Sequence, residues 1–359
     1  MVTPVAVTGE ALLVPFASPK PPPRAKLPSP PAKQTPTSKL SEALLALGWG
    51  ESAPSAPAVA PAGIDTWLEV ATSLSLHQSG VYASLCAAGP PEVSLEEQIE
   101  IDIARTQLGD AGELIVNRRR EALRRVLHAY TRYDPATGYV QGMDSIAAAA
   151  LMHDTASTNA APRPRDSAAA LEERAFWWLV HVSGTLLDGF FTQGMPGLWR
   201  ELSVLRAALV SVRPKLVTKL DNLGFDLTLL APGWYLTLFT RILDDAELEP
   251  TLSEIAVCNI EPTHVALGVV LACESELLAA IDFDQAAAAL CGTVGASRTR
   301  RAPAGVLAHA MKLATVLMPP KKLAQMRADE AAGAADQMVG TPRARQATRR
   351  WFESPWSKK

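Results

Sequence analysis

The middle of the chain carries apolar residues at the spacing of amphipathic helices. One stripe, at positions i, i+3, i+4 and i+7, consists of Leu123, Val126, Leu127 and Tyr130. Asn117 is a suitable N-cap for this helix, and Asp134-Pro135 is expected to end it, because proline disfavours a helical conformation in the residue before it. The other side of the helix is rich in arginine, so we expect one face in the core and one in solvent.

The same kind of pattern continues towards the C-terminus. A second stripe, which ends before Pro214, consists of Leu198, Leu202, Leu205 and Leu209. Ser167 is placed to cap another helix that runs through the aromatic stretch 176–178 to Leu187. We find no runs of alternating apolar and polar residues bounded by hairpin turns. The pattern therefore predicts an all-α fold from about Ile64 to Met318.

Composition divides the chain into three parts. Of the 28 prolines, 13 lie within the first 62 residues, and such a sequence buries too little apolar surface to offset the entropy cost of ordering. Residues 61–320 contain the periodic helices and are expected to form the folded domain. Residues 321–359 are polar at first, and then six basic residues are mixed with Trp351, Phe352 and Trp356. We therefore expect disordered segments at 1–60 and 321–359.

Each flanking segment leaves two interpretations open. The proline-rich segment is either a plain solvated tail or a partner segment, which would bind an SH3-type domain or a kinase that recognises its Ser-Pro and Thr-Pro sites. The basic and aromatic C-terminal tail is either a soluble tail or a peripheral contact with an anionic membrane surface.

Charge and targeting signals narrow the class of protein. The net charge of -3 and the pI near 6.1 argue against nucleic acid as a partner, because a phosphate-binding surface normally shows a basic excess. The first residues lack the basic start of a secretory signal, and no apolar run reaches the roughly 18 residues that a spanning helix needs. The four irregularly spaced cysteines are typical of reduced thiols. We expect a cytoplasmic protein.

The first candidate for chemistry is an arginine near position 105. The chain has no P-loop, no dinucleotide-binding glycine motif, no HExxH pair and no paired CxxC, so the sequence indicates no nucleotide or metal site of its own. In a helix, Ile99, Asp102 and Arg105 lie three residues apart, so the carboxylate can hold the guanidinium while Ile99 anchors the helix to the core. An ordinary surface salt bridge has the same spacing, and this alternative stays open.

The second candidate is a glutamine between two glycines. In Gly138-Tyr139-Val140-Gln141-Gly142-Met143 the glycines allow another backbone to approach on either side of Gln141, which favours contact with a partner protein. The alternative is a tight turn in which Tyr139 and Met143 pack inward.

Several blocks of sequence resemble the TBC-domain family of activators of Rab GTPases. They are Ile99-x-x-Asp102-x-x-Arg105-Thr106, Leu123-Arg-Arg-Val-Leu-x-Ala-Tyr130, Gly138-Tyr-Val-Gln-Gly-Met143, Gly194-Met-Pro-Gly-Leu198 and Trp234-Tyr-Leu-Thr-Leu-Phe239. The resemblance covers about 64–318. It implies an all-α, V-shaped domain of two lobes, which we expect to meet near the polar stretch 153–166.

The resemblance also implies which residues act. It assigns Arg105 as a finger that stabilises transition-state charge and Gln141 as a finger that positions water, supported by Asp102, Ile99, Tyr139, Gly142 and Met143. The partner Rab GTPase is the hydrolase and carries GTP and Mg²⁺, so this chain needs no cofactor. The implied function is GTPase activation in vesicle trafficking, in the cytoplasm or at the periphery of endomembranes.

Two departures from the family pattern bear on this implication. Asp144 stands where the family commonly has asparagine, and we expect little effect. Residues 253–259 fall where the family usually has Arg-Ile-Trp-Asp, so a packing tryptophan is missing from the second lobe. One alternative is a TBC-fold adaptor that binds a Rab without activating it, and another is an unrelated helical scaffold. The intact Arg105 and Gln141 favour catalysis over the adaptor, and the matching blocks disfavour the scaffold.

Overall fold

The computed structural model describes residues 67–68, 77–109, 112–153, 167–257, 260–291 and 306–336. The proline-rich segment 1–60 and the basic and aromatic end of the chain lie outside these residues, so the SH3-type, kinase and membrane contacts stay predictions. The expected lobe junction at 153–166 lies outside them too, apart from His153, and also stays a prediction.

Where the chain is described, its regular structure consists of helices, which confirms the all-α class. In chain order the elements are α3 (Val81–Ala87), α4 (Val93–Arg105), α5 (Glu113–Tyr133), α6 (Met143–Met152), α7 (Ala168–His181), η3 (Val182–Leu186), α8 (Pro196–Val212), α9 (Pro214–Asn222), η4 (Leu227–Leu229), α10 (Ala231–Leu236), α11 (Asp245–Ala256), α12 (Pro262–Ala272), α13 (Glu274–Ala279), α14 (Phe283–Cys291), α15 (Val306–Leu317) and α16 (Pro320–Asp336). Of these, η3 is a π-helix and η4 a 3-10 helix.

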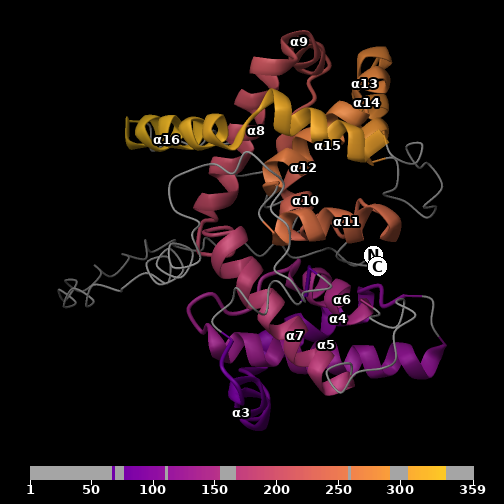
Figure 1. Cartoon of the computed structure of the whole chain (residues 1–359), viewed down its shortest axis with the longest axis vertical. Helices are drawn as coiled ribbons and strands as arrows, with labels where there is room; N and C mark the ends of the chain where they lie inside the picture. Colours follow the sequence, from indigo (N-terminus) through magenta and orange to yellow (C-terminus); the bar gives the residue numbers. More distant parts are fainter. Residues whose placement is uncertain are drawn as a thin grey trace, which may run out of the picture.

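The helices form two lobes, as the resemblance implied (Figure 1). We call α3 to α7 the first lobe, at the bottom of the view, and α8 to α16 the second lobe, at the top. The π-helix η3 lies on the path from α7 to α8. Helices α6 and α7, on either side of 154–166, pack against each other within the first lobe.

Helix α5 lies at the centre of the first lobe and contacts α3, α4, α6 and α7. Its predicted apolar stripe is confirmed, because Leu123, Val126, Leu127 and Tyr130 are all buried. The predicted cap is wrong: the helix begins at Glu113 after Gly112, and Asn117 lies inside it. The first turn escaped the pattern because it is exposed, with 66% of Leu114 accessible.

Helices α6 and α7 complete this lobe. Every residue of α6 from Met143 to Leu151 is buried, and its alanines let the neighbouring helices approach closely. Ser167 caps α7 as predicted, because its hydroxyl oxygen accepts a hydrogen bond of 3.2 Å from the backbone N–H of Ala170. The helix expected to reach Leu187 continues from α7 into η3, which ends at Leu186.

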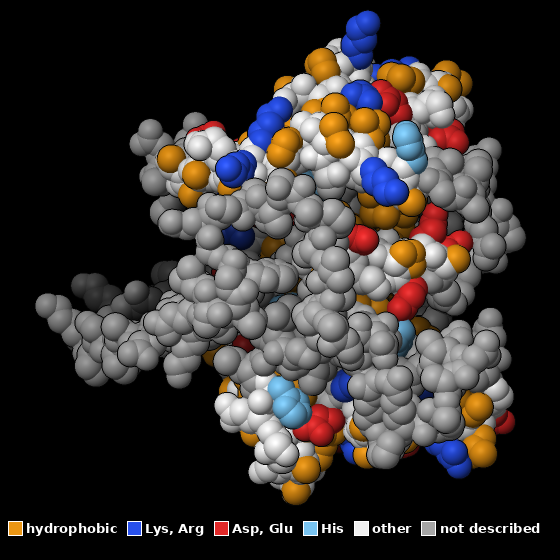
Figure 2. Space-filling model, in the orientation of Figure 1, with side chains coloured by type: hydrophobic (Ala, Val, Ile, Leu, Met, Phe, Trp, Pro, Cys, Tyr) orange, Lys and Arg blue, Asp and Glu red, His pale blue; other side chains and the backbone are white. Residues whose placement is uncertain are grey.

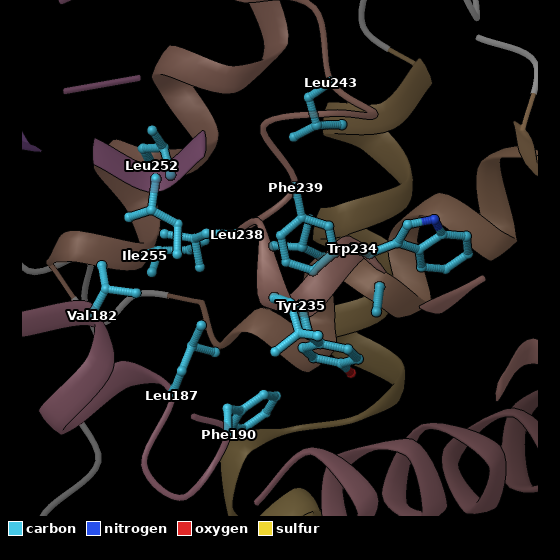
Figure 3. Packing of buried hydrophobic residues seen from close by; sticks show 14 of the residues in the cluster. Val182, Leu187, Phe190, Trp234, Tyr235, Leu238, Phe239, Leu243, Leu252 and Ile255 are labelled. Carbon is cyan, nitrogen blue, oxygen red and sulfur yellow. The ribbon is translucent and has the colours of Figure 1, made fainter. Parts of the chain in front are cut away.

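Apolar side chains from the segment between the lobes pack against those of the second lobe (Figure 3). Val182, Leu187 and Phe190 come from this segment, and Leu238, Leu252 and Ile255 are among those from the second lobe. All of them belong to one hydrophobic core that extends through both lobes. Packing therefore constrains how the second lobe sits on the first. Where the family tryptophan is missing, α11 buries the aliphatic Leu252 and Ile255 instead, while Cys258 and Asn259 lie outside the described residues.

The outer surface gives no sign of a membrane span. None of the described helices is long and apolar enough to cross a bilayer. On the face shown in Figure 2, hydrophobic, basic and acidic side chains are interspersed over the described surface. Cys86 and Cys273 are free thiols, as expected, and burial raises the pKa of Cys273 to about 11, which disfavours the reactive thiolate.

The folded region extends past the predicted boundary at 320. Helix α16 packs across α8, and Arg327 on it forms hydrogen bonds of 2.7 and 2.9 Å with the two carboxylate oxygens of Glu201. Arg327 also pairs with Glu261, at 2.5 Å, at the start of α12. Although burial opposes ionisation of Glu201, the Arg327 guanidinium lowers the pKa of that carboxyl. The polar, alanine-rich composition of 321–336 resembled a tail because this helix buries few apolar residues.

We predict that Arg327→Ala destabilises the protein by roughly 3 kcal/mol, because the buried carboxylate of Glu201 loses two hydrogen bonds and keeps only the more distant Arg200, at 3.3 Å, as its cation. Lys321→Ala, on the exposed side of the same helix, is the matched control and should change stability by about 0.5 kcal/mol or less. Urea unfolding of both variants measures the difference. Equal midpoints would show that the ion pair of Arg327 with Glu201 contributes no stability.

Candidate functional site

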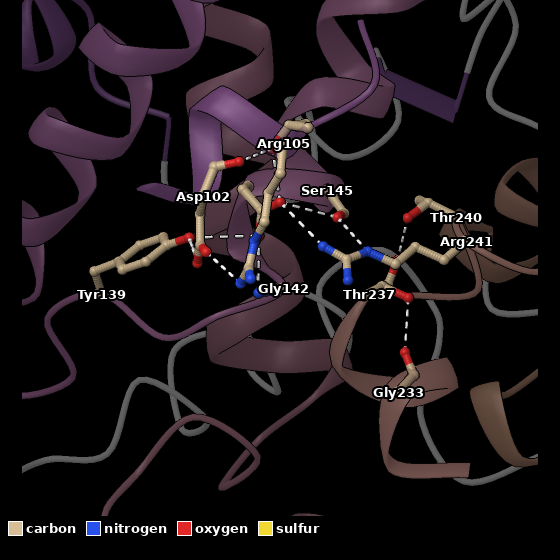
Figure 4. A network of polar contacts seen from close by, with 11 residues as sticks. Asp102, Arg105, Tyr139, Gly142, Ser145, Gly233, Thr237, Thr240 and Arg241 are labelled. Atoms are coloured by element: carbon tan, nitrogen blue, oxygen red, sulfur yellow. Dashed lines mark hydrogen bonds and ion pairs between the residues drawn. The ribbon is translucent and has the colours of Figure 1, made fainter. Parts of the chain in front are cut away.

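Arg105 is the last residue of α4, and its side chain lies against Asp102 one turn earlier (Figure 4). The predicted pair is confirmed, because Nη2 of Arg105 forms an ion pair with Oδ1 of Asp102. It is not an ordinary surface salt bridge, since only 16% of the arginine side chain and 7% of the aspartate side chain are exposed. The Nε of Arg105 is buried without a hydrogen-bond partner among the described residues. Ile99 is fully buried and anchors the helix, as predicted.

Tyr139 connects α4 to the glutamine segment. Its hydroxyl donates a hydrogen bond of 2.5 Å to Oδ2 of Asp102, across 37 residues of sequence. Burial raises the pKa of Tyr139 well above its usual range, and the negative charges of Asp144 and Asp102 add to this, so the hydroxyl keeps its proton as a donor. Burial also raises the pKa of Asp102, and the charge of Asp144 acts in the same direction.

Gln141 lies in the turn that precedes α6. The backbone N–H of Met143 donates to the carbonyl oxygen of Val140 at 3.2 Å, which closes the turn around Gln141. Tyr139 and Met143 pack inward, as the tight-turn interpretation predicted. Gln141 itself is half-buried, and its side chain makes no hydrogen bond with another residue that the structure describes. The turn is therefore structural, and the side-chain amide of Gln141 takes no part in the hydrogen bonds that the structure describes for it.

The glycine after Gln141 faces the protein's own second lobe. Gly142 has φ +111°, and a Cβ at this position would lie 2.3 Å from the carbonyl oxygen of Leu236 in α10. This close approach within the protein itself requires glycine here. Gly138, with φ +64°, has only the side chain of Leu95 nearby, at 3.9 Å.

Asp144 makes more contacts within the site than its position in the sequence predicted. Its side chain is fully buried, and its oxygens accept hydrogen bonds from the N–H of Gly142 at 2.9 Å and the hydroxyl of Ser145 at 3.1 Å. The hydroxyl of Thr106 lies 2.9 Å from Oδ2 of Asp144. Gly142 is the N-cap of α6, and no side chain caps this helix.

Arg241, from the second lobe, is the residue at this site that the sequence did not reveal. Its Nε donates to Oγ of Ser145 at 3.1 Å, and its Nη2 lies 3.4 Å from Oδ2 of Asp144 (Figure 4). The turn that places it contains Leu238 and Phe239 with φ +46° and +63°, a left-handed conformation that costs about 1–2 kcal/mol per residue outside glycine. Arg241 is 97 residues from Asp144, so no local pattern could have indicated the contact.

The comparisons with known proteins identify the family. The family model described as the Rab-GTPase-TBC domain matches residues 76–257, about half of the chain, and the chain therefore belongs to this family. It is 31% identical over 170 residues to Carabin of Mus musculus and 30% identical over 180 residues to TBC1 domain family member 2A of Rattus norvegicus. These matches cover 46% and 49% of this chain. They span only 34% and 18% of the two relatives' own lengths.

Solved structures show the same fold. The Chlamydomonas flagellar RabGAP TBC domain is similar with a TM-score of 0.52 at 22% identity, covering 78% of this chain and 91% of that one. The Ypt/Rab-GAP domain of Gyp1p is similar with a TM-score of 0.50 at 16% identity, covering 70% of this chain and 79% of that one. At these identities the likeness concerns the fold.

We predict that Gly142→Ala destabilises the protein by about 3 kcal/mol, because the new methyl group must displace the α10 backbone and also tolerate a positive φ. Gly138→Ala is the matched control: it shares the positive φ but has room for a methyl group, so it should cost only about 1 kcal/mol. Thermal unfolding of both variants measures the difference. If the two variants unfold at the same temperature, the contact with Leu236 does not constrain the turn.

Proposed function

We propose that this chain is a GTPase-activating protein that accelerates GTP hydrolysis by a Rab-family GTPase, with Arg105 and Gln141 as two fingers supplied in trans. Membership of the Rab-GTPase-TBC family supports a Rab GTPase as the partner. The partner holds GTP and Mg²⁺, and this chain supplies side chains only. The wider role would be the regulation of vesicle trafficking, in the cytoplasm or at the periphery of endomembranes.

The observation that carries the proposal is the hydrogen bond from Tyr139 to Asp102. Asp102 holds the guanidinium of Arg105, and Tyr139 begins the turn that presents Gln141. One buried aspartate therefore fixes both segments relative to each other. This is the preorganisation that transition-state stabilisation requires, since two groups must reach one reacting phosphate together.

The proposed chemistry divides between the two fingers. A water molecule attacks the γ-phosphorus of GTP, the bond from phosphorus to the β,γ-bridging oxygen breaks, and GDP leaves while the water's proton passes to the phosphate product. The guanidinium of Arg105 stabilises the negative charge that develops on the phosphate oxygens during this step, a contribution of about 10³- to 10⁵-fold for arginine fingers. The amide of Gln141 orients the attacking water.

Arg105 must extend to reach a nucleotide, because little of its side chain is exposed against Asp102. Its Nε has no hydrogen bond to lose among the described residues, so the movement breaks one ion pair and frees a donor that was unsatisfied. The partly buried pair also supports the alternative function, an adaptor that binds a Rab and keeps its arginine on Asp102. The hydrolysis rate with the unchanged protein, compared with that of the two finger variants, separates these functions.

We predict that Arg105→Ala lowers the activated rate of GTP hydrolysis by about 10²- to 10⁵-fold, because the transition-state charge loses its cation. Arg105→Lys should rescue little of this rate, since an ammonium lacks the planar fork of donors. Single-turnover hydrolysis against a panel of Rab GTPases measures the rate, and circular dichroism checks the fold. An alanine variant with nearly full activity would overturn the assignment of Arg105 as a finger, whereas an unchanged protein that activates no Rab would favour the adaptor.

We predict that Gln141→Ala cripples activation even when the partner GTPase retains its own catalytic glutamine. A GTPase variant without that glutamine should still respond to the unchanged protein, because this chain positions the water. The same hydrolysis assay compares the Gln141→Ala variant with an unchanged GTPase and the unchanged protein with the GTPase variant. If the partner's glutamine proves essential and Gln141 silent, the turn at 139–142 is structural only and the arginine acts alone.

A further inference from the structure

The carboxylate of Asp144 touches both finger segments at once. Thr106, whose hydroxyl lies 2.9 Å from Oδ2 of Asp144, directly follows Arg105. Gly142, whose N–H donates to Oδ1 at 2.9 Å, directly follows Gln141. A shift of this carboxylate would therefore move the backbone beside each finger.

A fully buried carboxylate needs positive charge nearby as well as hydrogen-bond donors. Asp102 already has Arg105 as its cation. For Asp144, the guanidinium of Arg241 approaches Oδ2 to 3.4 Å, and it also donates to Ser145 in the first turn of α6 at 3.1 Å. The cation that compensates Asp144 therefore comes from the other lobe.

The segment that carries Arg241 is held tightly. Thr237 donates through Oγ1 to the carbonyl oxygen of Gly233 at 2.7 Å, and Thr240 donates to that of Thr237 at 2.8 Å (Figure 4). The left-handed residues Leu238 and Phe239 lie between them and are buried. Backbone strain that packing maintains in this way is characteristic of segments that position a functional group. The carbonyl oxygen of Leu236, just before this turn, is the atom that lies against Gly142.

We infer that Arg241 is a positioning residue for GTPase activation: through Asp144 and Ser145 it clamps the segments that carry Arg105 and Gln141, and so makes the finger geometry depend on the second lobe. This inference rests on the proposed function. Arg241 itself need not touch the nucleotide. About 41% of its side chain is exposed, so its replacement creates no cavity in the core.

The test compares Arg241→Ala and Arg241→Lys with Arg206→Ala, which removes an arginine from a surface pair with Asp221 in the second lobe. We expect Arg241→Ala to lower kcat of the activated GTPase reaction by about 10- to 100-fold with KM changed by about twofold or less, because a misplaced group costs the transition state more than docking. Lysine should restore part of kcat, since it keeps the charge but lacks the planar fork of donors that the guanidinium offers to Ser145 and Asp144. Arg206→Ala should match the unchanged protein.

A double-mutant cycle with Asp144→Asn tests the pairing itself. Asp144→Asn alone should lower kcat, because the amide turns a donor towards the guanidinium. In the background of Arg241→Ala the same change should restore activity, because it removes the uncompensated charge. The inference would be overturned if the fold-change in kcat of the double variant equalled the product of the two single fold-changes. An unchanged kcat in Arg241→Ala would also overturn it.

Amide hydrogen exchange of 139–146, in the protein without a GTPase, separates this inference from the proposed function. We expect faster exchange there in Arg241→Ala than in Arg206→Ala, whatever the activity towards GTPases. If the unchanged protein activates no Rab but exchange responds, the proposed function fails and the clamp stands. If the unchanged protein activates a Rab, but Arg241→Ala changes neither the exchange rate of 139–146 nor kcat, only the inference about Arg241 fails.

Discussion

Two buried carboxylates, those of Asp102 and Asp144, impose the constraint on which the site depends. An ionised carboxylate loses its hydration on burial, so each must be surrounded by donors and cations that the fold supplies. Here the donors come from three separate segments: the end of α4, the turn before α6 and the turn after α10. Satisfying the two charges therefore fixes these segments relative to one another. The positions of the exposed side chains of the site thus depend on the buried carboxylates of Asp102 and Asp144.

This constraint also bears on the state of the arginine before any partner binds. Arg105 rests on Asp102 with its Nε unsatisfied, an arrangement that is stable but incomplete. A buried donor without an acceptor costs free energy that a fully paired arginine would not pay. The side chain is thus held less firmly than Asp102, which Tyr139 also binds at 2.5 Å. The aspartate, which is bound by two partners, is therefore the more constrained member of the pair.

Local features of the site could be predicted from sequence, and long-range ones could not. The Asp102–Arg105 pair and the Ser167 cap follow from spacing within one helix, and both are present. The contact of Gly142 with Leu236 and that of Arg241 with Asp144 join segments nearly a hundred residues apart. No local sequence pattern in either segment predicts these contacts. Helix α16 was missed for a related reason, since it buries few apolar side chains and its Arg327 binds Glu201, 126 residues earlier in the chain.

The identity of residue 144 connects these observations. The resemblance to the family leads one to expect asparagine there, and a neutral amide would satisfy the N–H of Gly142 equally well with its oxygen. It would then turn its NH2 group towards Thr106, Ser145 and Arg241. The two hydroxyls can rotate to accept from an amide, but a guanidinium cannot accept at all. Of these neighbours, Arg241 is therefore the one that distinguishes aspartate from asparagine. Aspartate at 144 and arginine at 241 form a matched pair across the two lobes, and the departure at 144 is better understood as part of the lobe contact than as a substitution at the helix start.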